Sequence, residues 1–115
     1  MTVGYFGYRL DNGDAVVRRQ RPGRDTKLPL RLDIDNHSPT GFEWGYGGSG
    51  PAQLALAILA DALDNDLRAL RLHQRFKWKV ICGLKRDEPW QLSLNAVLAT
   101  VAMIELEAEQ DEVSI

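Results

Sequence analysis

The chain has 115 residues, a formal net charge of −2, 44% hydrophobic residues and one cysteine. This length fits a single domain that can bury a core without a disulfide or a metal ion, and the lone Cys82 excludes an internal disulfide and favours a reducing compartment. The sequence shows neither a secretory signal peptide nor an apolar run of about 20 residues, so we expect a cytoplasmic protein without a membrane segment. The nearly balanced charge argues against a general nucleic-acid coat protein.

The first part of the chain predicts a β-hairpin. Residues 3–10 are rich in aromatic and β-forming types, and residues 15–20 form the returning strand. Asn12-Gly13 between them is the strongest short hairpin signal, because both central residues of a tight turn must take φ > 0.

A third strand is expected after a second turn at residues 21–24. From residue 28 to residue 34, apolar side chains alternate with polar ones, and this period of two is typical of a strand that is buried on one face. The alternating apolar residues are Leu28, Leu30, Leu32 and Ile34. The sequence therefore predicts a three-stranded antiparallel meander over residues 3–35.

A long glycine- and aromatic-rich loop at residues 36–50 precedes the helical part. Pro51 suits the first position of a helix, with Ser49 or Gly50 as the cap and Gln53 placed to reach back to that cap. The remaining pattern predicts helices at residues 51–63, 67–82 and 94–109, a short strand near residues 89–92, and a frayed acidic tail at residues 110–115. The expected fold class is α+β.

Apolar residues at helical spacing define the faces that the later helices bury. In the second helix these residues are Ala69, Leu72, Phe76 and Val80. In the third helix they are Leu94, Val97, Leu98, Val101 and Ile104.

A long motif covers the loop and the start of the first helix, HSPTGFEWGYGGSGPAQLALA at residues 37–57. Together with Tyr5-Phe6-Gly7-Tyr8-Arg9, Phe76-Lys77 and Trp90-Gln91-Leu92, this motif resembles a domain-of-unknown-function family of small bacterial proteins that are frequent in phages, prophages and plasmids. The resemblance covers most of residues 5–92 and implies mobile-element ancestry but no biochemical activity. Family chains usually end soon after the Trp-x-Leu segment, so we expect the third helix and the acidic tail to be particular to this chain.

The first candidate site is the glycine-rich loop. Free backbone N–H groups at a helix N-terminus attract anions, and an aromatic side chain beside them can stack on a nucleotide. The loop is not a Walker motif, because no Gly-Lys-Ser/Thr follows it. The alternative is a packing turn in which aromatic side chains fill the core. The residues of this candidate site are Trp44, Tyr46, Gly47, Gly48, Ser49 and Gly50.

The second candidate consists of Asp33, Asp35 and His37, which leave the expected third strand on one side. Two carboxylates and an imidazole are ligands that suit iron or manganese. The only other histidine is His73, on the second helix. The alternative is a solvated strand face, and the sequence as a whole predicts no cofactor.

The third candidate is a basic stripe on the second helix, at spacings of three and four residues. Such a stripe meets a phosphate backbone or an acidic protein surface. The alternative is a solvated face that acidic residues of the last helix, Glu105, Glu107 and Glu109, partly neutralise. The residues of the basic stripe are Arg68, Arg71, Arg75 and Lys79.

No complete catalytic set is present, so we expect a non-enzymatic binding protein of phage or mobile-element origin. Its expected partner is a host protein of a defence or nucleic-acid-processing complex, and nucleic acid itself is not the favoured partner. One alternative is a binder of a nucleotide or another phosphorylated metabolite at Gly45–Gly50. A second alternative is a metal-dependent enzyme that uses Asp33, Asp35 and His37.

Overall fold

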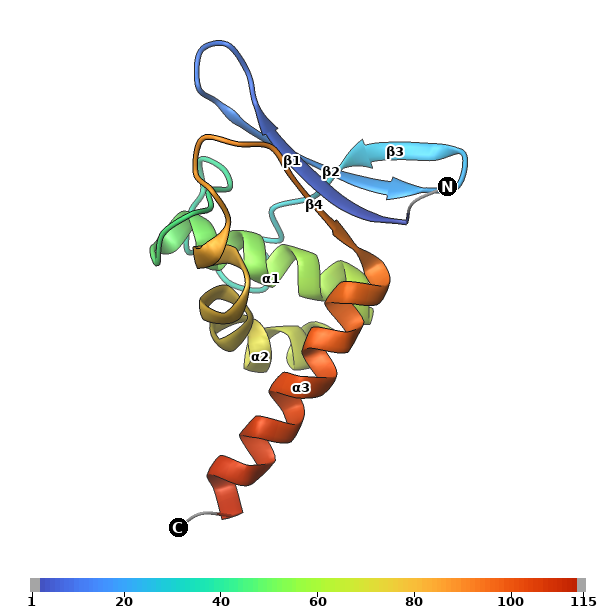
Figure 1. Cartoon of the computed structure of the whole chain (residues 1–115), viewed down its shortest axis with the longest axis vertical. Coiled ribbons are helices and arrows are strands. Elements are labelled where there is room, and N and C mark those ends of the chain that lie inside the picture. Colours follow the sequence, from blue (N-terminus) through green and yellow to red (C-terminus); the bar gives the residue numbers. More distant parts are fainter. Residues whose placement is uncertain (1–2, 114–115) are drawn as a thin grey trace.

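The computed structural model in Figure 1 describes residues 3–113 of the chain. Its elements in chain order are β1 (Gly4–Arg9), β2 (Ala15–Arg21), β3 (Arg24–Lys27), α1 (Ser49–Leu63), α2 (Asp66–Lys79), the 3₁₀ turn η1 (Ile81–Gly83), β4 (Trp90–Ser93) and α3 (Leu94–Val113). The strands pair antiparallel in one sheet of order β3-β2-β1-β4. The α+β class and the N-terminal meander are confirmed, and the short strand predicted near residues 89–92 becomes the neighbour of β1.

The hairpin between β1 and β2 closes through a three-residue loop. The N–H of Leu10 donates to the carbonyl of Asp14 at 2.9 Å, and the N–H of Gly13 donates to the carbonyl of Leu10 at 2.8 Å. Of the two predicted turn residues, Gly13 takes a positive φ of 90° and Asn12 does not. The hairpin is therefore confirmed, but its turn is the longer type in which glycine alone adopts the left-handed conformation.

The third strand lies earlier in the chain than predicted. It is β3, directly after the Pro22-Gly23 turn, and the segment 28–34 is irregular and includes a turn. Arg31 has a φ of 58°, which no regular strand contains. Leu28 is buried while Leu32 is 37% exposed, so the alternating leucines do not share one buried face. The predicted strand at residues 28–34 is wrong.

Helix α1 begins at Ser49, two residues before the predicted start, with Gly48 as its cap. The expected return of Gln53 to this cap is wrong, because the Gln53 side chain points into the core, where it is 0% exposed. Burial of a polar side chain is tolerated only where its hydrogen-bonding groups find partners.

Gln53 binds four backbone groups of the loop before α1. Its Oε1 accepts hydrogen bonds from the N–H groups of His37 at 2.8 Å and Ser38 at 3.0 Å. Its Nε2 donates to the carbonyl oxygens of Leu30 at 2.6 Å and Asp35 at 3.1 Å. A side-chain amide offers two donors and an oxygen with two lone pairs, so this single side chain is fully used in fixing the loop.

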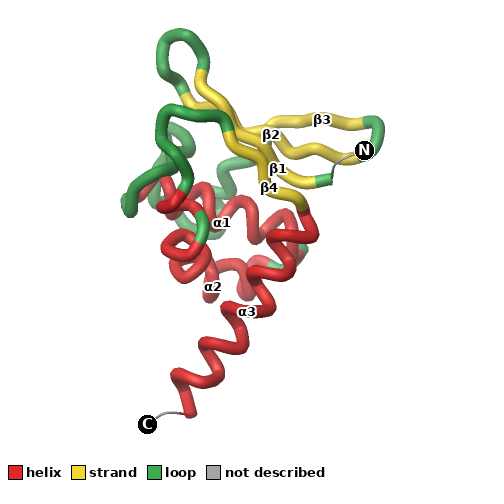
Figure 2. The backbone as a smooth tube through the Cα atoms, viewed as in Figure 1, coloured by secondary structure: helices red, strands yellow, loops and turns green. Residues whose placement is uncertain are grey.

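Helix α1 packs between the sheet and α2 (Figures 1 and 2). All residues from Gly50 to Ala60 are buried. At the end of the helix, Asp61 accepts hydrogen bonds from Arg19 at 2.6 Å, from Arg21 at 2.7 Å and from the Tyr5 hydroxyl at 2.6 Å. These contacts fasten the helix to β1 and β2, and within residues 3–113 no helix covers the other face of the sheet (Figure 2).

Helix α2 starts at Asp66, one residue before its predicted start. The Asn65 side chain accepts a hydrogen bond from the N–H of Arg68 at 3.0 Å and so caps the helix. The helix ends at Lys79 rather than at residue 82, and η1 follows it. Its predicted core residues are buried, except that Val80 is half-buried.

Helix α3 extends away from the rest of the fold (Figure 1) and continues to Val113, beyond its predicted end. Ser93 caps it, accepting a hydrogen bond from the N–H of Ala96 at 3.0 Å. The predicted burial is wrong for Leu98, which is 39% exposed. Residues 110–113 of the predicted frayed tail belong to this helix, and the last two residues of that tail lie outside the described part. None of the helices within residues 3–113 has the length and apolar character needed to cross a membrane.

Candidate functional site

The glycine-rich loop packs against large side chains. Gly45 takes a φ of 88°, a conformation that favours glycine. A Cβ atom at Gly47 would lie 2.3 Å from the Trp78 ring, so a larger residue there requires this ring to move. Trp44 is 0% exposed and contacts Trp90 edge to face at a centroid distance of 5.6 Å. Trp44 is therefore part of the core and does not present a ring for a ligand, which favours the packing-turn alternative.

The exposed part of the loop borders a polar hollow of about 470 Å³. Tyr46, Ser49 and Gly50 line it, and so do the acidic residues Asp14 and Glu43. Carboxylates repel phosphate groups, so the geometry gives no support to a phosphate site at this helix start. Gly48, the remaining candidate of the loop, lies against the Tyr46 ring, which a Cβ would approach to 2.5 Å.

The basic stripe of α2 faces acidic residues of α3. Its pairs are Arg68 and Arg71 with Glu105, Arg75 with Asp111 at 2.9 Å, and Lys79 with Glu107 at 2.6 Å. The Arg68 guanidinium, hydrogen-bonded to both carboxylate oxygens of Glu105, holds the pKa of this carboxyl below its ordinary value. This geometry favours the alternative in which the last helix neutralises the stripe.

The structure brings together two of the three predicted metal ligands. Asp35 and His37 lie close together, whereas Asp33 binds Arg31, with Oδ1 at 3.0 Å from Nε. The segment is a turn rather than a strand, so a period of two does not place its side chains. The third member of the cluster is His73 of α2, and burial lowers the pKa of its imidazole below the ordinary value.

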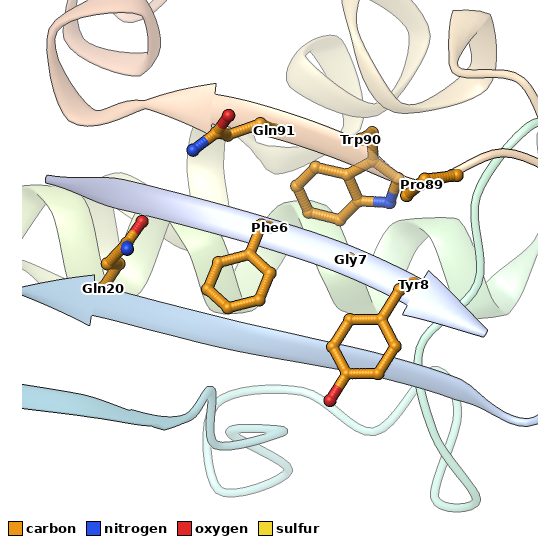
Figure 3. A pocket seen from close by; sticks show the side chains of 7 residues that line it. All are labelled: Phe6, Gly7, Tyr8, Gln20, Pro89, Trp90 and Gln91. Atoms are coloured by element: carbon orange, nitrogen blue, oxygen red, sulfur yellow. The ribbon is translucent and has the colours of Figure 1, made fainter. Parts of the chain in front are cut away.

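A shallow groove of about 520 Å³, widely open to solvent, lies on the uncovered side of the sheet (Figure 3). Its lining residues are Phe6, Gly7, Tyr8, Gln20, Pro89, Trp90 and Gln91, none of which is charged. The groove is not predictable from local sequence patterns, because it depends on the pairing of β4 with β1. The sequence feature that points to the groove is the set of aromatic residues at positions 5, 6 and 8, which places rings on both faces of one strand.

The rings of Phe6 and Tyr8 lie side by side in this groove (Figure 3). Their centroids are 6.2 Å apart and their planes differ by 18°. Tyr5, the neighbour of Phe6 in β1, points to the opposite face and is 1% exposed. Strand β1 thus supplies the core with one aromatic side chain and the groove with two.

The model of a family described as "Family of unknown function (DUF6166)" matches residues 5–103 of the chain. No curated protein and no solved structure matches. The matched range runs from β1 into α3, past residue 92. The expectation that the third helix is particular to this chain is therefore wrong for the first half of α3.

Proposed function

The chain belongs to this family of unknown function, DUF6166, and we propose that it is a binding protein that holds a segment of a partner protein in the groove of the sheet. The observation that carries the proposal is the pair of aromatic rings, Phe6 and Tyr8, side by side in a groove with an uncharged lining. Aromatic residues contribute most of the binding energy in many protein interfaces.

The chemistry of the lining favours a peptide over a nucleic acid. Phosphate backbones are held mainly by Lys and Arg; neither type lines the groove, and Arg18, the cross-strand neighbour of Phe6, is already paired with Asp25 at 3.0 Å. The amides of Gln20 and Gln91, which flank the ring of Phe6 in Figure 3, offer both donors and acceptors to a peptide backbone. Extended segments with prolines or other apolar side chains bind in aromatic-lined grooves of this kind.

We propose a host protein of a defence or nucleic-acid-processing complex as the partner, in the cytoplasm, in line with the mobile-element ancestry that the resemblance implies. The groove is a better candidate surface than the basic stripe, because the stripe must release its ion pairs with α3 before it meets a partner. The alternatives of a nucleotide binder and a metal-dependent enzyme stay predictions.

Removing either ring of the groove is expected to weaken peptide binding by about 30-fold, which corresponds to the loss of one interface aromatic. The probes are peptides selected from a random display library for binding to the wild-type protein. Peptides that also bind the double variant Phe6→Ala/Tyr8→Ala are removed by counter-selection. Fluorescence anisotropy then gives the Kd of each selected peptide for the wild-type protein, Phe6→Ala and Tyr8→Ala.

The matched control is Trp78→Ala, which removes an aromatic side chain that is 64% exposed on α2 and does not line the groove. We expect this variant to bind the selected peptides as the wild-type protein does, and circular dichroism verifies that every variant is folded. Selection of no peptide, or of peptides that bind the double variant equally well, contradicts the proposal.

A further inference from the structure

Three side chains with metal-ligating atoms converge where the loop before α1 meets α2. Asp35 and His37 come from the loop and His73 comes from α2, and one ligand atom of each lies within 4.8 Å of the others. We propose that these three residues bind one divalent transition-metal ion, with Zn²⁺ as the representative of the class.

The distances between the ligand atoms suit such an ion. Nε2 of His37 lies 2.9 Å from Nε2 of His73 and 3.3 Å from Oδ2 of Asp35. Four ligands arranged tetrahedrally around zinc at about 2.0 Å are about 3.3 Å apart. The two imidazoles therefore need to separate by only a few tenths of an ångström, and rotation of the Asp35 side chain completes the set.

Hydrogen bonding decides which nitrogen of His73 faces the cluster with a lone pair. Nδ1 of His73 lies 2.6 Å from the carbonyl oxygen of Leu70, and because a carbonyl only accepts, Nδ1 carries the proton. Nε2 is then the unprotonated nitrogen and accepts a hydrogen bond from Nε2–H of His37, so ion binding requires the His37 proton to move to Nδ1 or to be released. Metal-bound histidines characteristically donate their other N–H to a carbonyl or carboxylate in this way, which fixes the ring orientation.

The backbone that carries the loop ligands is held from the core. Gln53 binds the N–H of His37 and the carbonyl of Asp35, so the two ligand-bearing residues are tied to α1 through one buried side chain. His73 itself is 4% exposed, whereas the Asp35 side chain is 45% exposed. The cluster thus combines a rigid frame with an open side for the entry of an ion.

The ligand types identify the class of ion. Two imidazoles and one carboxylate suit zinc, cobalt and iron, whereas magnesium and calcium prefer ligand sets made of oxygen. Three protein ligands leave at least one coordination position for water. The affinity of a protein site for divalent ions rises from manganese to copper in nearly the same order whatever its ligands. A site for zinc, cobalt or iron therefore also binds Co²⁺ or Zn²⁺ added as a probe.

The experiment uses the full chain without a histidine tag, treated with chelator and then titrated with Zn²⁺ by calorimetry and with Co²⁺ by visible absorption. We expect one ion per chain with a Kd of about 1 μM or tighter, a Co²⁺ absorption band of a nitrogen- and oxygen-ligated ion, and a Tm raised by about 5 °C at saturating Zn²⁺. The variants His37→Gln and Asp35→Asn are expected to weaken binding by about 100-fold or more. Both ligands are partly exposed, so these variants are expected to fold, whereas substitution of the buried His73 puts folding at risk.

The matched control is Asp33→Asn, the same chemical change two residues from Asp35, at a carboxylate that binds Arg31 instead of the cluster. This variant is expected to bind Zn²⁺ and Co²⁺ as the wild-type protein does. Failure of both ions to bind stoichiometrically, or equal loss of binding in Asp33→Asn and Asp35→Asn, would overturn the proposal. Neither result bears on peptide binding in the groove, which involves other residues.

Discussion

Replacing Gln53 by leucine is expected to lower the free energy of unfolding by about 4 kcal/mol. Leucine fills a similar volume but leaves four backbone groups of the loop before α1 without their partner. Each buried polar group that loses its hydrogen bond costs about 1–3 kcal/mol, and water reaches part of this loop, so the total stays below the sum of four full penalties. Urea denaturation followed by circular dichroism measures the change.

The control for this prediction is Gln74→Leu, the same substitution at an exposed position of α2. We expect it to change the free energy of unfolding by less than about 0.5 kcal/mol. If Gln53→Leu is as stable as Gln74→Leu, the loop does not depend on the hydrogen bonds of Gln53.

The variant Trp44→Ala is expected to lose about 4 kcal/mol of stability, because it removes the largest fully buried side chain of the core. The ring contacts Trp90 edge to face, and the Arg9 guanidinium lies 4.5 Å from its centroid. Neither neighbour can fill the space that the indole leaves. Thermal and urea unfolding of the variant measure this loss.

The comparison variant is Tyr46→Ala, two residues along the same loop, where the side chain is 39% exposed. Its expected loss is about 1 kcal/mol or less, since the ring is partly open to solvent and otherwise lies against Gly48 and the Arg86 side chain. Equal losses in the two variants would show that the loop is not built around Trp44. A stable Trp44→Ala protein would return Trp44 to the set of candidate ligand contacts.

Local signals predict most of the secondary structure. The Asn12-Gly13 hairpin is found where the sequence places it, and the Asn65 and Ser93 caps likewise depend only on residues a few positions away. The segment 28–34 is the exception, since its alternating leucines imitate a strand. Its carbonyl at Leu30 binds Gln53 instead of a neighbouring strand, a contact between residues far apart in the chain that periodicity cannot detect.

The candidate sites show the same division between local and long-range information. Asp35 and His37 are two residues apart, so the sequence places them together, but His73 joins them only through the packing of α2. The groove likewise needs β4, which follows β1 by about 80 residues in the chain and lies beside it in the sheet. The sequence already offers acidic residues of the last helix as partners of the basic stripe, but only the packing of α3 on α2 shows that Asp111, and not Glu109, joins Glu105 and Glu107 in these pairs.

Partner binding in the groove is tested most directly by backbone amide NMR shifts of the isotope-labelled protein, titrated with a peptide selected on it. We expect the largest shift changes at Phe6, Tyr8, Gln20 and Gln91, with the amides of the basic stripe on α2 unchanged. The largest changes at Arg71 and Arg75, with β1 and β4 unaffected, would contradict the proposed function.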